Sequence, residues 1–403
     1  MAQEVYFQRS EFTSLNFSGG ELKIRESSEE SGYGLRILKD GRLGFAYCQD
    51  KEKLDEARER AGKLSKFSPK TDFSFPPQAG YGKPDIFDSD IEPSDFGKFR
   101  ELLEQAREAA ETFGARSKVV VSAHKSFTEL ENSEGFSGSY DDTGFSMYVE
   151  AMHGEGLGIG YISSNHIVDV GATALEAAGM ARDMQNAKKP EAGKYAVVAQ
   201  IEALDTLLEV LLPSFSGDWR RRGITSLPGK TFSEKLSVYD DPLSSGTSAR
   251  PFDDEGIPSK RKTLIEKGEV ESYLYDLETA ALAGEDGSGS CLRDSYDDNP
   301  SIGSSNIVVS PGTWNDLGEI EKYIELHYAH GSHTANLTTG DVGLEVSAAF
   351  LVEGDKRTPL KGFMISANIF DMFANIEAVE SKVRTVGSLT APRMAFSDVH
   401  VVS

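Results

Sequence analysis

The stretch L-L-E-V-L-L-P-S-F-S-G-D-W-R-R-R-G, at residues 207–223, divides the chain into two halves of different construction. Its first part is apolar and continues a helical pattern that begins near residue 201, which predicts a buried helix. Pro213 and Gly217 then predict a turn, and three consecutive arginines follow it. Before this stretch strands alternate with helices, whereas after it helices are scarce and turns are frequent.

The first half predicts an N-terminal α/β domain over residues 1–190, with an antiparallel sheet and long helices. Lys39-Asp40-Gly41 separates two alternating apolar runs and is typical of a hairpin turn. The expected elements, in order, are a strand meander at 3–49, helices at 51–64 and 96–110, strands within 119–161 and a helix at about 168–187.

The second half predicts a mostly antiparallel β domain over residues 191–403, built as a barrel-like or twisted sheet. Together the two halves indicate an α+β protein. Residues 282–304, rich in Gly, Ser and Asp, are expected to form a long loop. The expected strands lie at 236–239, 263–265, 273–275, 306–309, 345–352 and 363–369.

Composition limits the possible partners. The 403 residues include 42 Lys and Arg against 65 Asp and Glu, which gives a formal charge of −23. This charge argues against direct nucleic acid binding, which requires basic surface. The sequence has no apolar membrane-spanning window and no apolar signal segment near its N-terminus, and Cys48 and Cys291 form no C-x-x-C pair. We therefore expect a cytoplasmic protein with no membrane partner and no nucleic acid partner.

The helix at 201–212 is the first candidate for chemistry. A metallopeptidase helix carries two histidines on one face, with a glutamate beside the first as general base. Glu209 is present here, but Leu208 and Pro213 occupy the flanking positions and have no lone pair suited to Zn²⁺. Taken alone, the segment indicates a buried helix followed by a turn.

Two other clusters of potential metal ligands occur in the second half. Asp253-Asp254-Glu255 could coordinate a hard cation, although a charge run before a Gly-Pro turn is more often solvated. His327, His330 and His333 lie within seven residues, and imidazole is a common metal ligand. Gly331 interrupts any helix there, so these histidines are only an alternative metal site.

Two further motifs are excluded as sites. The glycine-rich run G-E-G-L-G-I-G at 154–160 has the wrong spacing for a dinucleotide-binding loop and is expected to be a strand. The sequence contains no G-x-S-x-G, so a serine hydrolase triad has no nucleophile elbow.

Several phrases, in order and over nearly the whole chain, resemble the TldD/PmbA family, whose members include the peptidase subunits TldD and TldE (PmbA). The phrases are G-L-R-I-L-K-D-G-R-L-G-F-A-Y at 34–47, S-G-D-W-R-R-R-G at 216–223, P-F-D-D-E-G-I-P at 251–258, L-I-E-K-G-E-V-E-S-Y-L-Y-D-L-E-T-A at 264–280, T-T-G-D at 338–341 and I-S-A-N-I-F-D-M-F at 365–373.

The resemblance implies what stands at the metal positions. TldD-type members carry a His-Glu-x-x-x-His helix before a Gly-Asp-x-x-Arg-Arg-Gly turn, and a cysteine near the C-terminus adds a third zinc ligand. Leu208, Glu209 and Pro213 fall at the His, Glu and second His positions, and residues 385–388 contain no cysteine. The chain therefore resembles the metal-free TldE/PmbA-type subunit, with no cofactor of its own and zinc in a TldD-type partner.

The family also implies a function. It predicts a TldD–TldE-type complex, a dimer that degrades unfolded, extended peptides and removes leader peptides, with this chain as the subunit without its own catalytic residues. Asp218, Arg221 and Arg222 would brace the turn after the helix or contact peptide. Two alternatives remain: an autonomous metallopeptidase that uses the histidines described above, and a homodimeric peptide-binding or regulatory protein. An older family label, modulator of DNA gyrase, names an effect rather than a chemistry.

Overall fold

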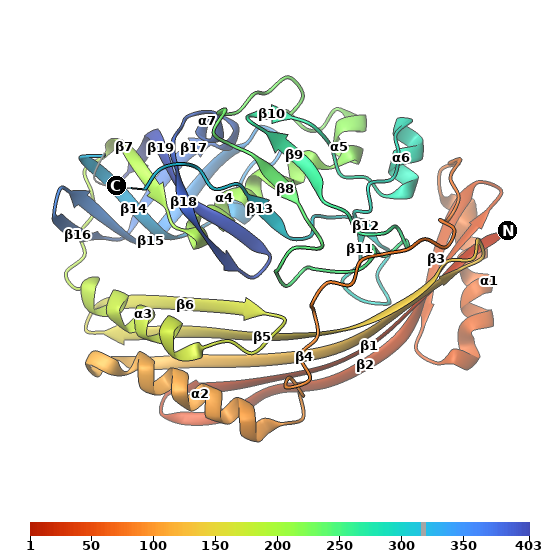
Figure 1. The fold of residues 1–403 in the computed structure, drawn as a ribbon, viewed down its shortest axis with the longest axis horizontal. Coiled ribbons are helices and arrows are strands. Elements are labelled where there is room, and N and C mark those ends of the chain that lie inside the picture. Colours follow the sequence, from red (N-terminus) through yellow and green to blue (C-terminus); the bar gives the residue numbers. More distant parts are fainter. Residues whose placement is uncertain (316–319) are drawn as a thin grey trace.

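The computed structural model describes residues 1–315 and 320–403 (Figure 1). These residues form a six-stranded sheet, an eleven-stranded sheet and a short two-stranded ribbon. Helices cover one face of the first sheet and enter the core of the second, which confirms the predicted α+β class. Figure 1 shows the second half of the chain lying along the concave side of the long, curved first sheet.

The six-stranded sheet is antiparallel throughout, in the order β3-β2-β1-β4-β5-β6. Asp40 and Gly41 both have positive φ between β2 and β3, which confirms the predicted hairpin turn. The strands are β1 (Ala2–Ser18), β2 (Glu21–Lys39), β3 (Arg42–Cys48), β4 (Arg116–Asn132), β5 (Ser137–His153) and β6 (Gly156–Ser164).

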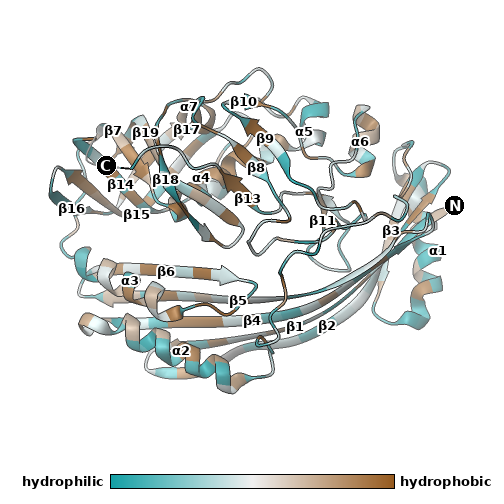
Figure 2. Ribbon diagram, viewed as in Figure 1, coloured by the Kyte–Doolittle hydropathy of each residue, from teal (hydrophilic) through white to brown (hydrophobic). Residues whose placement is uncertain are grey.

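Three helices pack on this sheet. α1 (Leu54–Leu64) lies against β2 and β3, while α2 (Phe96–Ala110) and α3 (Val170–Asp183) pack on each other and on β4, β5 and β6. Asp95 and Asp169 cap α2 and α3 by accepting hydrogen bonds from the backbone amides of the first turn. Figure 2 shows that α1 and much of the outer side of α2 are hydrophilic, as expected for helices with one buried stripe.

The second sheet closes part of itself into a barrel. Its strands run in the order β10-β9-β8-β13-β19-β17-β15-β14-β7, and β19 also pairs with β7, so that β7, β14, β15, β17 and β19 form a closed ring. This confirms the predicted barrel-like, mostly antiparallel sheet. Its strands are β7 (Gly193–Ala199), β8 (Val238–Asp240), β9 (Lys262–Glu266), β10 (Glu269–Val270), β13 (Ile307–Val309), β14 (Lys322–His330), β15 (Asp341–Glu353), β16 (Lys356–Leu360), β17 (Phe363–Asn368), β18 (Ile376–Val386) and β19 (Leu389–Val402).

Helix α4 (Ile201–Leu211) lies in the hydrophobic core that the barrel strands enclose. Its apolar residues pack with those of β14, β19 and α7 (Ile369–Ala374), which confirms the expected buried helix. Two shorter helices, α5 (Gly217–Arg222) and α6 (Leu277–Ala283), pack on each other beside it. No helix among the described residues is both long and apolar enough to cross a membrane.

Several elements differ from the sequence predictions. Residues 273–275 are not a strand, although Leu274 forms an isolated bridge with Ser216. The expected loop at 282–304 holds the ribbon of β11 (Cys291–Leu292) and β12 (Ser301–Ile302). Strands β14, β18 and β19 and helix α6 were not predicted, because their apolar residues are interrupted by charged residues, histidines or small residues.

Candidate functional site

Helix α4 presents one polar edge from an otherwise apolar segment. Leu204, Leu207, Leu208 and Leu211 are all buried in the barrel core. Residues four apart in a helix share a face, so Asp205 and Glu209 project from the same side of α4. The helix then tightens into a 3₁₀ turn, Leu212–Phe215, that contains Pro213.

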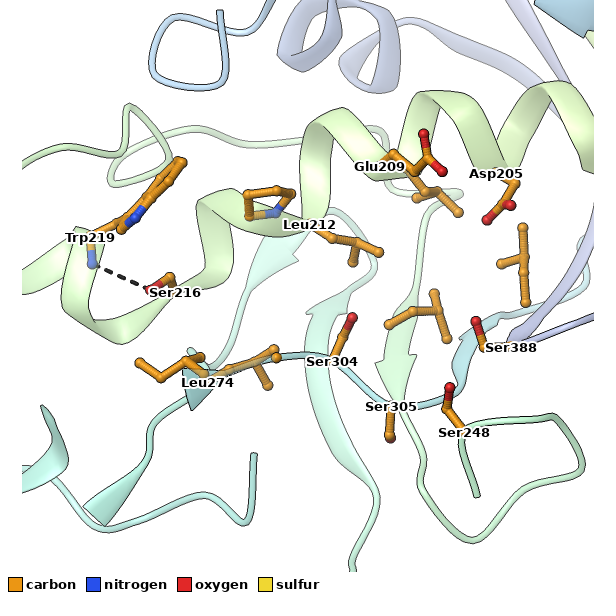
Figure 3. A pocket seen from close by; sticks show the side chains of 16 residues that line it. Asp205, Glu209, Leu212, Ser216, Trp219, Ser248, Leu274, Ser304, Ser305 and Ser388 are labelled. Atoms are coloured by element: carbon orange, nitrogen blue, oxygen red, sulfur yellow. Dashed lines mark hydrogen bonds between the residues drawn. The ribbon is translucent and has the colours of Figure 1, made fainter. Parts of the chain in front are cut away.

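A pocket of about 520 Å³ opens beside this polar edge (Figure 3). Leu208, Glu209 and Pro213 all line it, together with Ser388 from the hairpin turn between β18 and β19. The structure thus brings the three helix positions together with the C-terminal region in which the sequence has no cysteine. The remaining lining residues are Asp205, Leu212, Ser216, Trp219, Ser248, Leu274, Ile302, Gly303, Ser304, Ser305, Ile307 and Leu389.

The donor atoms of this pocket do not fit a zinc ion. Zinc sites in proteins use thiolate, imidazole and carboxylate ligands. Leu208 and Pro213 have apolar side chains, and Ser388 contributes a hydroxyl group rather than a thiolate. The Glu209 carboxylate accepts a hydrogen bond from Ser332 Oγ at 2.7 Å, so it is held by the protein itself.

Asp205 is the electrostatically unusual residue of the pocket. Its side chain is exposed to the pocket, and no hydrogen bond or ion pair to it occurs within residues 1–315 and 320–403. Surrounding protein, and then the negative charges of Glu209 and Glu202, raise the pKa of Asp205 to about 6. A carboxylate in this state favours a protonated form or a nearby cation.

The turn after α4 is built by local contacts. Backbone bonds from Gly217 N–H to Leu274 O at 2.8 Å and from Leu274 N–H to Phe215 O at 2.9 Å align it with the segment before α6. A Cβ on Gly217 would lie 2.1 Å from the Tyr275 ring, so this position requires glycine. Ser216 caps α5 by accepting a hydrogen bond from the Trp219 amide.

Family models match the chain in three parts. The description "PmbA/TldA metallopeptidase C-terminal domain" matches residues 192–403, "domain 1" matches 4–65 and "central domain" matches 89–185. The chain belongs to the PmbA/TldD family. As a PmbA/TldD chain, it has relatives along almost its entire length.

Among these relatives, an uncharacterized protein of Methanocaldococcus jannaschii is 28% identical over 405 residues, covering 98% of this chain and 94% of its own. A metalloprotease of Methanothermobacter thermautotrophicus is 26% identical, covering 93% and 87%. In fold, the chain resembles the crystal structure of TldE from Thermococcus kodakarensis, with a TM-score of 0.88, 23% identity and coverage of 100% and 97%.

The arginine motif of this PmbA/TldD chain is paired within its own helix. Asp218 accepts hydrogen bonds from Arg221 at 2.7 Å and from Arg222 at 3.1 Å. Burial tends to raise the pKa of Asp218, but these two hydrogen bonds lower it below its ordinary value. None of the three residues lines the pocket. The two hydrogen bonds lie within α5, so both roles, a brace for the turn and a contact with peptide, remain predictions.

The three histidines have separate partners. His327 Nε2 lies 3.1 Å from Glu325 Oε1, whereas His330 Nε2 lies 3.2 Å from Ser347 Oγ. His333 lies in a 3₁₀ turn after β14 and is exposed. Among the described residues, no group of three or more His, Cys, Asp or Glu side chains is arranged to hold a metal ion.

The interpretation of Asp253-Asp254-Glu255 as a solvated run is wrong, because all three residues are buried. Glu255 Oε1 accepts a hydrogen bond from Arg36 Nη1 at 2.7 Å, which joins the second half of the chain to strand β2. Arg36 also donates to both oxygens of Glu4 on β1, at 2.9 and 2.6 Å. The acidic run therefore helps to join the two halves of the chain. We call this buried set of ion pairs, formed by Glu4, Arg36, Asp254, Glu255 and neighbouring arginines, the seam; the arginines balance the negative charge of the carboxylates.

Two more arginines complete this seam. Arg293 donates to Glu4 at 2.9 Å, and Arg250 lies 3.8 Å from Asp254. Burial raises the pKa of Glu255, although Arg36 opposes this shift. The sequence could not reveal the two pairs that cross between the halves, since Arg36 and Glu255 are 219 residues apart and Glu4 and Arg293 are 289 residues apart.

Proposed function

We propose that this chain is the non-catalytic, TldE-like subunit of a two-subunit zinc metallopeptidase. In this complex a TldD-type subunit holds the zinc ion and performs hydrolysis of unfolded and leader peptides, while this chain helps to bind the extended peptide. The observation that carries the proposal is the pocket beside α4. The pocket brings together Leu208, Pro213 and Ser388, none of which carries a zinc-binding side chain, and the family resemblance implies metal ligands in these parts of the chain.

Family membership and the second sheet support the peptide-binding part of the proposal. Relatives of this chain include metalloproteases, which act on peptide bonds. Strands β16 and β18 branch from the main strand order, and β10 ends that order. Residues 312–314 bridge the outer edge of β18 at residues 379–381, whereas no strand in the described part of the chain pairs with the outer edge of residues 382–386. Such edges can accept an extended peptide as an additional strand. The turn that follows β18 contributes Ser388 to the pocket, so a peptide along β18 would reach it.

The test is to purify this chain alone and together with a TldD-type protein from the same organism. We expect a stable complex in which zinc and peptidase activity on an unfolded protein depend on the partner. The chain alone is expected to hold far less than one zinc ion and to leave the substrate intact. Stoichiometric zinc and peptidase activity in the isolated chain would contradict the proposal and favour an autonomous enzyme.

A further inference from the structure

The pocket beside α4 has the electrostatic character of a cation site. Asp205 and Glu209 are the only ionisable residues among the 16 that line it, and both are acidic. Clefts lined by charge of one sign focus the field and concentrate ligands of the opposite sign. A ligand that enters this pocket therefore meets negative charge and no positive charge.

None of the described residues that line this pocket carries a positive charge. Arg384 lies 3.7 Å from Glu202 in the first turn of α4, and no ion pair between Arg384 and Asp205 occurs among the described residues. Arg221 and Arg222 are paired with Asp218 within α5, and Arg220 faces Tyr275 and Glu285. Glu209 has a hydroxyl partner, which leaves Asp205 as the carboxylate without a partner in the described part of the chain.

The remainder of the wall is apolar or carries hydroxyl groups. Figure 3 shows Asp205 extending from α4 toward the side of the pocket that carries Ser388, with Leu212 and Leu274 farther along the cavity toward Trp219. Lysine and arginine side chains combine a long apolar stem with a charged end, and they bury the stem against apolar surface. A volume of about 520 Å³ accommodates such a side chain.

We propose that this pocket binds a positively charged group of the peptide, namely the ammonium or guanidinium group of a lysine or arginine side chain, with Asp205 as its main partner and Glu209 as the second. The inference rests on the proposed function, because it assumes that the chain receives peptide. It adds a preference for basic residues at one position of that peptide. The replacement of family zinc ligands by Leu208 and Pro213 then leaves apolar wall for the stem of that side chain.

The experiment measures binding of synthetic peptides to the full chain. Trp219 lines the pocket, so its fluorescence in a Trp314→Phe background reports occupancy, and calorimetry provides a second readout. All peptides are N-acetylated and differ at only one position, which is lysine, arginine or norleucine, the uncharged analogue of lysine. We expect the lysine and arginine peptides to bind about tenfold more tightly than the norleucine peptide at pH 7.5.

Variants locate the effect. Asp205→Asn is expected to reduce the affinity for the lysine peptide to that of the norleucine peptide and to leave the norleucine peptide unaffected. Glu234→Gln makes the same change of charge at an exposed position outside the pocket and is expected to bind like the unmodified chain. Affinity for the lysine peptide should also fall as the pH falls through about 6, because Asp205 becomes protonated next to Glu209 and Glu202.

The outcomes separate the two proposals. Equal affinities for lysine and norleucine peptides would overturn the basic-residue inference and leave the peptide-binding function standing. A norleucine peptide with a free N-terminus is added as a comparison; if it binds as tightly as the acetylated lysine peptide, the ammonium group belongs to the peptide terminus, which retains the cation chemistry but overturns the side-chain source. If no peptide binds the chain alone or in its complex, both proposals are contradicted.

Discussion

Asp205 is a residue whose charge costs stability in the folded chain. Its pKa rises from 3.8 to about 6, since protein surrounds it and Glu209 and Glu202 repel its negative charge. A carboxyl group with a raised pKa binds protons more tightly in the folded state than in the unfolded state. The folded chain therefore gains stability from this group as the pH falls from about 6 toward 3.8, and loses it above that window.

Asp205→Asn is accordingly expected to stabilise the isolated chain at pH 7.5, by about 1 kcal/mol once the exposure of the side chain to solvent is considered. Thermal unfolding between pH 4.5 and 8 checks this, because the gain should disappear near the acid end. Asp218→Asn is the control of opposite sign. The pKa of Asp218 is lowered by Arg221 and Arg222, so its removal should destabilise the chain at pH 7.5. A lower melting temperature for Asp205→Asn at pH 7.5 would show that Asp205 has a stabilising partner.

At the scale of elements, the α4–α5 segment shows what the sequence could predict. Apolar spacing indicated the buried helix, and Pro213 marked its C-terminal end. The arginine run that the sequence placed in a turn is instead the short helix α5. The convergence of Leu208, Glu209 and Pro213 with Ser388 could be expected only from the family resemblance, because helical spacing says nothing about a hairpin that follows much later. Asp205 was missed, although its position four residues before Glu209 was a usable signal.

Gly217 tests the packing of this segment. Gly217→Ala is expected to destabilise the chain by about 1–3 kcal/mol, because the new Cβ would lie 2.1 Å from the Tyr275 ring and displace the segment before α6. Gly62→Ala in α1 is the matched control. No atom lies within 4 Å of its added Cβ, so it should stabilise the chain by about 0.5–1 kcal/mol. Urea unfolding measures both variants, and equal effects would show that Tyr275 does not pack on Gly217 as described.

At the scale of the whole molecule, a buried set of charges joins the two halves. Glu4 and Arg36 belong to the first sheet, whereas Glu255 and Arg293 belong to the second half. Composition predicted a strongly acidic chain, but it could not show which carboxylates lie inside. Burying these carboxylates is favourable only because arginines from distant parts of the chain form well-oriented hydrogen bonds to them, and the folded structure is needed to see these pairings.

Arg36→Met is therefore expected to destabilise the whole chain by about 3–5 kcal/mol, because it leaves Glu4 and Glu255 buried without their shared cation. The loss should be smaller at low pH, because burial raises the pKa of Glu255 and protonation there removes one of the buried charges. Lys23→Met, which removes an exposed ion pair with Glu21, should change stability by less than about 0.5 kcal/mol. Equal losses for the two variants, measured by urea unfolding, would contradict the description of a buried seam.

The central claim is that the pocket beside α4 lacks the donor atoms of a zinc site at the positions where the family resemblance implies metal ligands. The most direct test compares zinc content, after dialysis against Zn²⁺ and removal of excess metal, between the unmodified chain and the variant Leu208→His/Pro213→His/Ser388→Cys. The account predicts negligible zinc in the unmodified chain and about one zinc ion per chain in the variant, since imidazole and thiolate donors would line the same pocket. Stoichiometric zinc in the unmodified chain, lost with Glu209→Gln, would contradict it.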